Sequence, residues 1–191
     1  MTHDTAEVND LSALEHTHNS VLYVVGLGTE AYEALLAAFA SYEEVGILQG
    51  DILNVASNCV VSPANSSGMM DGGIDLDYLG YFGSHIEKEL QELISKLPAP
   101  GLKIGTCVHL ETGDSDITWM IAAPTVVEPG FTEKVNIGRA LYALLKHLKN
   151  YPHLQPCYSP LLGSGVGGVL PEVAAKEMAS AYRDWILKNT L

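Results

Sequence analysis

The sequence predicts an α/β fold, in which a mostly parallel or mixed β-sheet carries helices on both faces. Short apolar runs typical of buried strands alternate along the chain with segments whose apolar residues recur at helical spacing. Two glycine-rich segments, 62–75 and 161–168, each follow a strand-like run and precede a helical pattern. The chain has 191 residues, of which 47% are hydrophobic and 17% charged, and this length and composition suit one globular domain.

The first third of the chain predicts three strands and one helix. Residues 1–19 are polar without a clear period, and we expect a flexible tail there and a single domain from residue 20 to residue 191. Residues 21–25 and 45–48 predict short buried strands, and a third apolar run covers 55–61. The helix between the first two strands has its apolar positions at Tyr32, Leu35, Leu36 and Phe39.

The remaining elements follow the first glycine-rich segment. The ranges 104–110 and 117–123 predict two strands joined by a turn at 111–114. A weaker strand is expected at 154–158, interrupted by Pro156. Three helices are predicted by apolar residues at helical spacing: Ile86, Leu90, Leu93 and Leu97; Ile137, Ala140, Leu141, Leu144, Leu145 and Leu148; and Ala174, Met178, Ala181 and Trp185.

Charge and cysteine content exclude several classes of protein. The net charge of −13 argues against general nucleic-acid binding, because that affinity depends on Lys and Arg neutralising phosphates. The three cysteines are widely spaced in apolar surroundings, so we expect buried thiols in a reducing, cytoplasmic compartment. We expect neither a metal nor a cofactor, since no CxxC or HxxxH pair occurs. No segment has the length of a signal peptide or of a membrane span.

The two glycine-rich segments predict a site for a phosphorylated small molecule. Loops between a strand and a helix can direct consecutive backbone N–H groups at an anion, and glycine lets a phosphate approach the main chain closely. Neither segment contains a lysine, so two facing loops would hold a diphosphate with main-chain groups alone. The second segment lacks the Lys-Ser/Thr ending of a P-loop, which argues against nucleoside-triphosphate hydrolysis. A flexible loop is its alternative interpretation.

Polar residues are concentrated in the first glycine-rich segment. Asn65 offers both a donor and an acceptor that suit a sugar diol. Asp71 and Asp75 flank Gly72-Gly73, and the carboxylate of Asp75 would lie at the start of the next helix. Helix capping alone explains one of these acids, because carboxylates are favoured in a first helical turn. It does not explain the whole group.

A third segment leaves two interpretations open. Gly26 to Ala31 matches the loose dinucleotide-binding fingerprint, and Asp51 follows twenty residues later, where a ribose-binding acid would be expected. The glycines can instead serve a steric role between strand and helix. Asp51 can also accept the exocyclic amine of adenine while the next backbone N–H donates to a ring nitrogen. Its remaining alternative is a turn or helix N-cap.

In order along the chain, four short motifs resemble those of the macro domain, an ADP-ribose-binding module. They are Gly50-Asp51-Ile52, then 61–65 (VSPAN), then 72–75 (GGID), and finally 163–168 (GSGVGG). The ten-residue step from Asn65 to Asp75 is similar to that of the MacroD-type hydrolases. Each motif is weak alone, but the ordered set spans about 120 residues and is specific.

The resemblance implies a three-layer α/β/α sandwich with a mixed, mostly parallel central sheet, and it assigns roles to residues. Asp51 and Ile52 would hold adenine, and Asn65 would contact the distal ribose. Asp75 would help to place a water that hydrolyses an ADP-ribosyl or O-acetyl-ADP-ribose ester bond, so Asn65 and Asp75 are the catalytic candidates. The diphosphate loops and their surroundings would contribute Ala64, Ser67, Gly68, Gly72, Gly73, Ile74, Gly163, Ser164, Gly165, Val166, Gly167 and Gly168.

Three departures from the family pattern keep a second function open. Gly167 stands where hydrolytic relatives have an aromatic residue, Ser62-Pro63 replaces Asn-Ala, and 69–71 (MMD) interrupts the usual glycine run. A neighbouring aromatic residue, Tyr78, Tyr81, Phe82 or Phe131, would have to supply the missing ring. The alternatives to a hydrolase are a non-catalytic ADP-ribose reader and a Rossmann-like, NAD-dependent oxidoreductase that uses Gly26 to Ala31.

Overall fold

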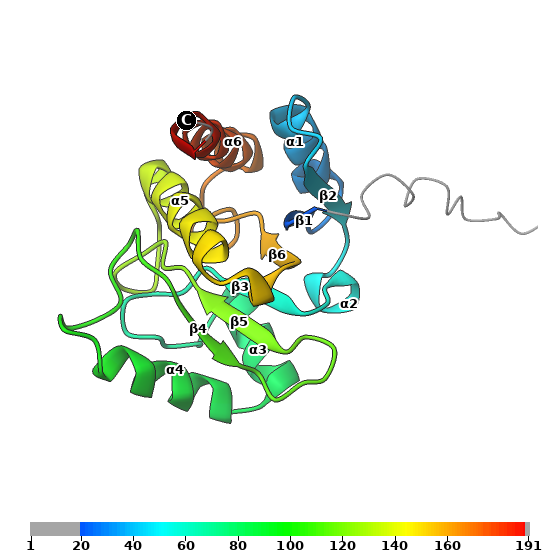
Figure 1. The fold of residues 1–191 in the computed structure, drawn as a ribbon. Coiled ribbons are helices and arrows are strands. Elements are labelled where there is room, and N and C mark those ends of the chain that lie inside the picture. Colours follow the sequence, from blue (N-terminus) through cyan, green and yellow to red (C-terminus); the bar gives the residue numbers. More distant parts are fainter. Residues whose placement is uncertain (1–19, 190–191) are drawn as a thin grey trace, which may run out of the picture.

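Six strands form one central sheet in the computed structural model, which describes residues 20–189 (Figure 1). They are β1 (Leu22–Gly26), β2 (Val45–Gln49), β3 (Cys59–Ser62), β4 (Val108–Glu111), β5 (Trp119–Ala122) and β6 (Cys157–Pro160). The strand order is β2-β1-β6-β3-β5-β4. Every pairing is parallel except that of β4 with β5. The predicted mixed, mostly parallel sheet is therefore confirmed, whereas the predicted tail, 1–19, lies outside the described residues.

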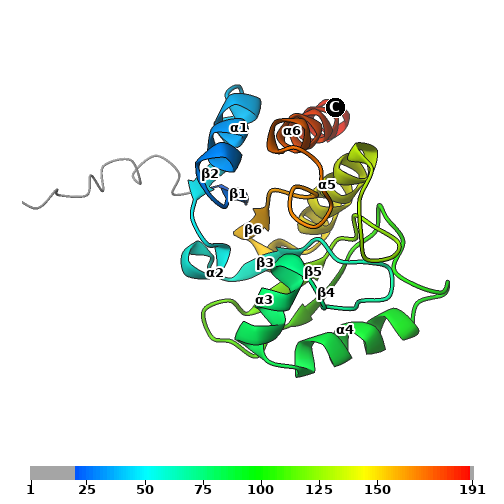
Figure 2. The same ribbon diagram turned by 180° about the vertical axis from the view of Figure 1, so that it is seen from behind.

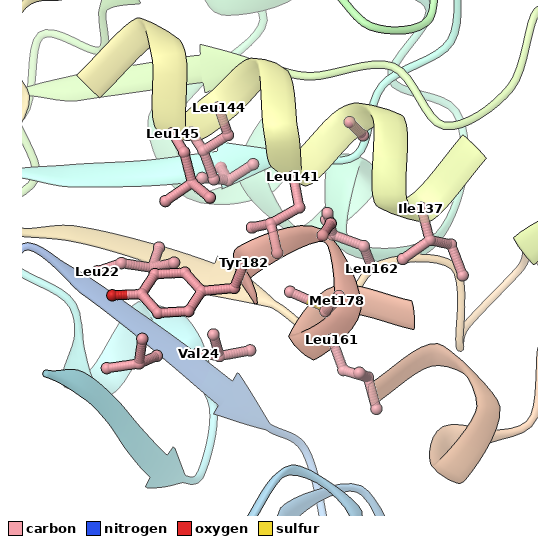
Figure 3. Close-up of a cluster of buried hydrophobic side chains, with 14 of the residues drawn as sticks. Leu22, Val24, Ile137, Leu141, Leu144, Leu145, Leu161, Leu162, Met178 and Tyr182 are labelled. Atoms are coloured by element: carbon pink, nitrogen blue, oxygen red, sulfur yellow. The ribbon is translucent and has the colours of Figure 1, made fainter. Parts of the chain in front are cut away.

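Three helices cover one face of the sheet: α1 (Thr29–Phe39), α5 (Lys134–Asn150) and α6 (Pro171–Asn189). Figure 3 shows leucines of α5 pointing toward Leu22 of β1 and Met178 of α6. All six apolar positions predicted for α5 are buried, so its sequence period identifies the face correctly. On α1 the buried face is rotated: Ala31 and Ala34 are buried, whereas Leu36 is 45% exposed.

The opposite face carries α3 (Gly73–Phe82) and α4 (His85–Ser95), which complete the three layers (Figures 1 and 2). Ile86 and Leu90 of α4 pack with Tyr78 of α3 in the second core cluster. Ile52, from the short helix α2 (Ile52–Val55), belongs to the same cluster. Because helices cover both faces, the central strands are buried on both sides, as expected of parallel sheets.

Three strand predictions were too long or misplaced. In the run 55–61, Val55 ends α2 and the strand begins only at Cys59, after Asn58 turns the chain with φ 60°. In the run 104–110 the strand begins at Val108. Leu154 ends a short 3-10 helix, η2 (Pro152–Leu154), and β6 begins directly after Pro156, which has no N–H to donate to a sheet.

The described residues also bear on the cysteine and membrane predictions. Cys59 and Cys157 are buried free thiols opposite each other on β3 and β6. Cys107 is a partly exposed free thiol, and desolvation raises the pKa of its sulfur to about 12. No helix between residues 20 and 189 combines the length and the apolar character needed to cross a membrane.

Candidate functional site

A cavity of about 490 Å³ opens at the carboxyl ends of the parallel strands. This volume lies within the range of small-molecule sites, and the position is the one where open α/β sheets bind ligands. Five connections line the cavity, and they follow β1, β2, β3, β5 and β6. Both glycine-rich segments contribute to the lining, so the structure brings together two loops that lie about 90 residues apart in the sequence.

Asn65 organises the first glycine-rich segment from within. It is 5% exposed, and its Oδ1 accepts hydrogen bonds from the Ser67 and Met69 amides, each at 3.1 Å. The Ser67 hydroxyl also donates to Oδ1, at 2.7 Å, and Asn65 Nδ2 donates to the Met69 carbonyl at 2.7 Å. Asn65 lines the cavity, but its amide group is committed to holding the loop in shape. Its predicted contact with a sugar stays a prediction.

Free backbone amides follow directly after this loop. The Met70 amide donates to Glu87 Oε1 of α4 at 2.8 Å, which anchors the chain just before the turn into α3. No side chain caps α3, whose first-turn amides have no partner inside the helix. In the described part of the chain, the amides of residues 71–74 donate to no protein acceptor. These amides therefore remain available at a cavity wall that includes Gly72 and Gly73.

The second glycine-rich segment forms a closed loop with a similar set of free amides. The Val169 amide donates to the Gly163 carbonyl and the Gly168 amide to the Gly165 carbonyl, each at 3.0 Å. Within residues 20–189, the amides of 165–167 have no protein acceptor. The two segments meet: a Cβ added at Gly73 would lie 3.1 Å from Val166 Cγ2, and Figure 2 shows the start of α3 on the same side as the chain before α6.

Gly167 occupies a position with no room for a side chain. A Cβ added there would lie 2.6 Å from the Gly163 carbonyl oxygen and 2.9 Å from Thr132 Cγ2. The absence of an aromatic ring at this position therefore follows from the local packing. Among the neighbouring aromatic residues, Tyr78 is fully buried and donates its hydroxyl to the Val61 carbonyl. Phe131 lies beside Gly168 and is 89% exposed.

Asp75 is the most unusual polar group of the cavity. It lies in the first turn of α3, is 8% exposed, and its Oδ1 has no hydrogen-bond partner. Burial raises the pKa of this carboxyl from 3.8 to about 7. The charge of Asp71 contributes to the raised pKa, while a hydrogen bond with Ser62 acts in the opposite direction. A buried carboxylate with one oxygen free of any protein partner and a near-neutral pKa suits proton transfer.

Asp51 is at once a helix cap and a cavity residue. Its Oδ1 accepts from the Leu53 amide at 3.0 Å, and its Oδ2 accepts from Asn54 Nδ2 at 3.4 Å, so it is the N-cap of α2. It is nevertheless exposed and lines the cavity beside Ile52, whose amide has no acceptor in the described chain. The capping interpretation is correct, and it leaves the carboxylate with accessible lone pairs for a ligand.

Most of the predicted site residues lie together in the cavity wall. Those that line it are Asp51, Ile52, Ala64, Asn65, Gly72, Gly73, Ile74, Asp75, Gly163, Ser164, Gly165, Val166 and Gly167. Three of the predicted residues, Ser67, Gly68 and Gly168, are not part of the lining. Gly68 packs against Ile94, and Ser67 is bonded to Asn65.

The segment after β5 is the longest part of the lining that the sequence analysis did not consider. Thr125, Val126, Pro129 and Gly130 all face the cavity. Thr125 is tied to the first glycine-rich segment, because its hydroxyl donates to the Pro63 carbonyl at 2.9 Å. A usable signal was present: proline and glycine follow the predicted strand 117–123, at the same sheet edge as the other loops.

The charged side chains of the cavity are all acidic. Asp51, Asp71, Asp75 and Asp77 line it, whereas no Lys, Arg or His does. No group of His, Cys, Asp or Glu among residues 20–189 has an arrangement that could hold a metal ion. An anion in this cavity would therefore be held by backbone amides and by the N-terminus of α3.

Comparison with known proteins identifies the relatives of this chain. The family model described as Macro domain matches residues 61–178. An uncharacterized protein from Aquifex aeolicus is 33% identical over 141 residues, which cover 73% of this chain and 81% of that protein. A macro domain-containing protein from Listeria monocytogenes is 27% identical over 143 residues, covering 74% of this chain and 80% of the relative.

Solved structures with a similar fold include two bacterial macrodomains. A variant of the Oceanobacillus iheyensis macrodomain, solved with ADPR, superposes with a TM-score of 0.64 at 18% identity and covers 90% of this chain and 81% of that one. The macrodomain of Mycobacterium tuberculosis DarG superposes with a TM-score of 0.60 at 22% identity. The match covers 71% of this chain and 87% of that one. At these identities the likeness concerns the fold.

Proposed function

The chain belongs to the macro domain family, and from this premise we propose that its cavity binds ADP-ribose. The proposal rests on two sets of unpaired backbone amides, those of residues 71–74 and those of residues 165–167. They lie on two loops that meet at one cavity, and no cationic side chain lines that cavity. This arrangement suits a pyrophosphate. The Oceanobacillus iheyensis macrodomain has been solved with ADP and, as a variant, with ADPR, which supports the assignment.

The strand order supports one orientation of the ligand. Asp51 follows β2 at one end of the sheet edge, the glycine-rich segments follow β6 and β3 in the middle, and Thr125 follows β5 at the other end. Four strand spacings separate β2 from β5, a span of about 19 Å. Adenine would lie at Asp51 and Ile52, the diphosphate between the glycine-rich segments, and the second ribose near Asn65 and Asp75.

We extend the proposal to hydrolysis, with Asp75 as the catalytic residue. The substrate would be an ester in which C1″ of the second ribose is joined to a carboxyl oxygen. A water held by Asp75 attacks C1″, the bond from C1″ to the ester oxygen breaks, and that oxygen leaves as a carboxylate. The water proton passes to Asp75, whose pKa of about 7 suits an acceptor at neutral pH. A phosphate of the bound ligand assists in holding the water.

A non-catalytic reader is the second candidate, and the packing at Gly167 favours it. No side chain fits there, so the second loop itself cannot place a ring against the distal sugar. Incubation with a mono-ADP-ribosylated protein separates the two candidates. Release of ADP-ribose over several turnovers is expected for a hydrolase, and no release at equal concentrations of enzyme and substrate would leave only the reader.

The NAD-dependent oxidoreductase receives less support from the fold. Gly26 is needed for close packing, because a Cβ there would lie 2.6 Å from the Tyr32 backbone nitrogen. The sheet order also differs from that of the dinucleotide-binding fold. Calorimetry with ADP-ribose and with NAD tests this alternative directly: tight binding of NAD without a preference for ADP-ribose would overturn the proposed function.

Asp51→Ala is expected to weaken ADP-ribose binding by about 1–3 kcal/mol, the scale of a lost hydrogen bond to a charged group. Because Asp51 also caps α2, Asp51→Ser serves as a second variant, since serine keeps the cap but removes the carboxylate. Asp184→Ala on α6 is the control for lost charge. Calorimetry should show weaker binding in both Asp51 variants only, and unchanged affinity in Asp51→Ser would remove the carboxylate from the adenine site.

A further inference from the structure

Phe131 is a large apolar side chain that the fold leaves almost fully in solvent. Its 89% exposure is the highest among the exposed large hydrophobic side chains of the described residues. Its ring lies against the main chain of Gly168, because a Cβ added there would be 2.6 Å from Phe131 Cδ1. Gly168 has φ 71°, a left-handed conformation that favours glycine. The backbone thus leaves space for this ring without burying it.

The residue that follows anchors the backbone beside the ring. The Thr132 amide donates to the Gly167 carbonyl at 2.9 Å, and the Thr132 hydroxyl donates to the Thr125 carbonyl at 2.6 Å. Thr132 therefore joins the second glycine-rich segment to the loop after β5. Because the backbone is already anchored, little backbone freedom is lost when the exposed ring binds a partner.

This ring lies beside the cavity, where the segment after β5 meets the segment after β6. Gly130 and Gly167 line the cavity. Phe131 directly follows Gly130 in the sequence, and its ring packs against Gly168, the residue after Gly167. In the proposed orientation this is the end where the second sugar lies. In that orientation, a group attached to the sugar would leave the cavity near the ring.

Other exposed apolar side chains lie on the same segments. Val127 is 63% exposed on the loop that carries Phe131, Val166 is 56% exposed in the second glycine-rich segment, and Leu170 is 69% exposed just after it. We call Val127, Phe131, Val166 and Leu170 the apolar rim. Exposed apolar groups that border a binding cavity are typical of an interaction surface.

The charge around the apolar rim limits the kind of partner. The exposed charged residues next to Phe131 are Glu128, Glu133 and Lys134, which sum to −1. Asp71 and Asp77 line the cavity itself, and the whole chain carries a net charge of −13. A nucleic-acid strand attached to the ligand would meet this negative potential, whereas an apolar polypeptide segment would not.

We propose that Phe131 is a specificity-determining residue, which contacts a polypeptide segment that carries the ADP-ribosyl group and has an apolar residue beside the modified side chain. The inference rests on the proposed function, because it takes the second sugar to lie at the β5 end of the cavity. The ring contributes to recognition of the carrier and not to the affinity for free ADP-ribose.

Binding of two peptides, each with ADP-ribose attached through a non-hydrolysable linkage, tests the inference. One peptide has leucine and the other has aspartate next to the modified residue. Phe131→Ala is expected to weaken the binding of the leucine peptide about tenfold, the scale of one aromatic contact at an interface. The affinity for free ADP-ribose should change less than about twofold. Phe131→Leu should retain most of the binding. Tyr81→Ala, which removes an exposed ring of α3, is the control and should change neither ligand.

The possible results separate this inference from the proposed function. Equal losses for the peptide and for free ADP-ribose, or no loss in either, would overturn the role of Phe131 while leaving the cavity as an ADP-ribose site. A dependence on Phe131 that appears only with an ADP-ribosylated oligonucleotide would overturn the polypeptide partner. A wild-type protein that does not bind free ADP-ribose would contradict the proposed function and this inference together.

Discussion

Asp75→Asn is expected to stabilise the protein at neutral pH. The folded-state pKa of Asp75, about 7, exceeds its ordinary value of 3.8, so the folded protein holds this proton more tightly than the unfolded chain does. Because of Asp75, the free energy of unfolding falls as pH rises from about 4 to about 7. Above that range the destabilisation by the buried charge is fully present. The variant should therefore gain stability over the wild type, on the order of 1–2 kcal/mol at pH 5 and a few kcal/mol at pH 8.

Urea denaturation of both proteins at several pH values measures this gain. Other groups that titrate in this range are present in both proteins, so their contributions cancel in the difference. Asp77→Asn, two residues further along α3, is the matched control for the lost negative charge and should show a small effect on stability. A difference between Asp75→Asn and wild type that stays constant from pH 5 to pH 8 would contradict the raised pKa.

The same substitution should lower hydrolysis by a large factor, about 100-fold or more if Asp75 acts on the water. Affinity for ADP-ribose should change less than turnover, because the adenine and diphosphate contacts remain. Gain of stability together with loss of turnover is the signature of a residue kept for function. Equal losses in affinity and turnover would assign Asp75 to binding, and the protein would then be understood as a reader.

Gly165→Val is expected to abolish most ADP-ribose binding while leaving the fold intact. A Cβ added at Gly165 has no protein atom within 4 Å, and its φ lies outside the left-handed region. Stability should therefore change by less than about 0.5 kcal/mol. Because Gly165 lines the cavity and its amide is unpartnered, a branched side chain there should block the diphosphate and weaken binding at least about tenfold.

Gly167→Ala is the informative comparison, because it should lower the stability of the fold, whereas Gly165→Val should not. Its Cβ would lie 2.6 Å from the Gly163 carbonyl oxygen, so the loop backbone must shift at a cost of about 1–3 kcal/mol of stability. Thermal melts and calorimetry of the two variants separate packing from ligand contact. Retained ADP-ribose affinity in a folded Gly165→Val protein would show that this loop does not hold the phosphates.

Local patterns in the sequence were sufficient to predict the architecture. The apolar period of α5 identifies its buried face, and the position of each glycine-rich segment after a strand places both at one edge of the sheet. These features depend on residues close together in the chain. The predictions fail where a local bond competes with an apolar pattern, as in the run 55–61, whose first residue ends the helix that Asp51 caps, so that the strand begins only at Cys59.

By itself the sequence determined the order of the six strands, of the glycine-rich loops and of the helices α1, α4, α5 and α6, because hydrophobic period and turn residues act over a few positions; it did not separate α2 and α3. Only the tertiary structure decided that the Asn65 amide group bonds to its own loop, that Gly167 has no space for a ring, and that Asp75 is buried with its Oδ1 unpartnered. It also added the segment after β5 and the exposed ring of Phe131. The burial of Asp75, the clash of Gly167 with Thr132 and the contact of Phe131 with Gly168 depend on segments that are remote in the chain, and the Asn65 bonds depend on a loop conformation; no apolar period records either.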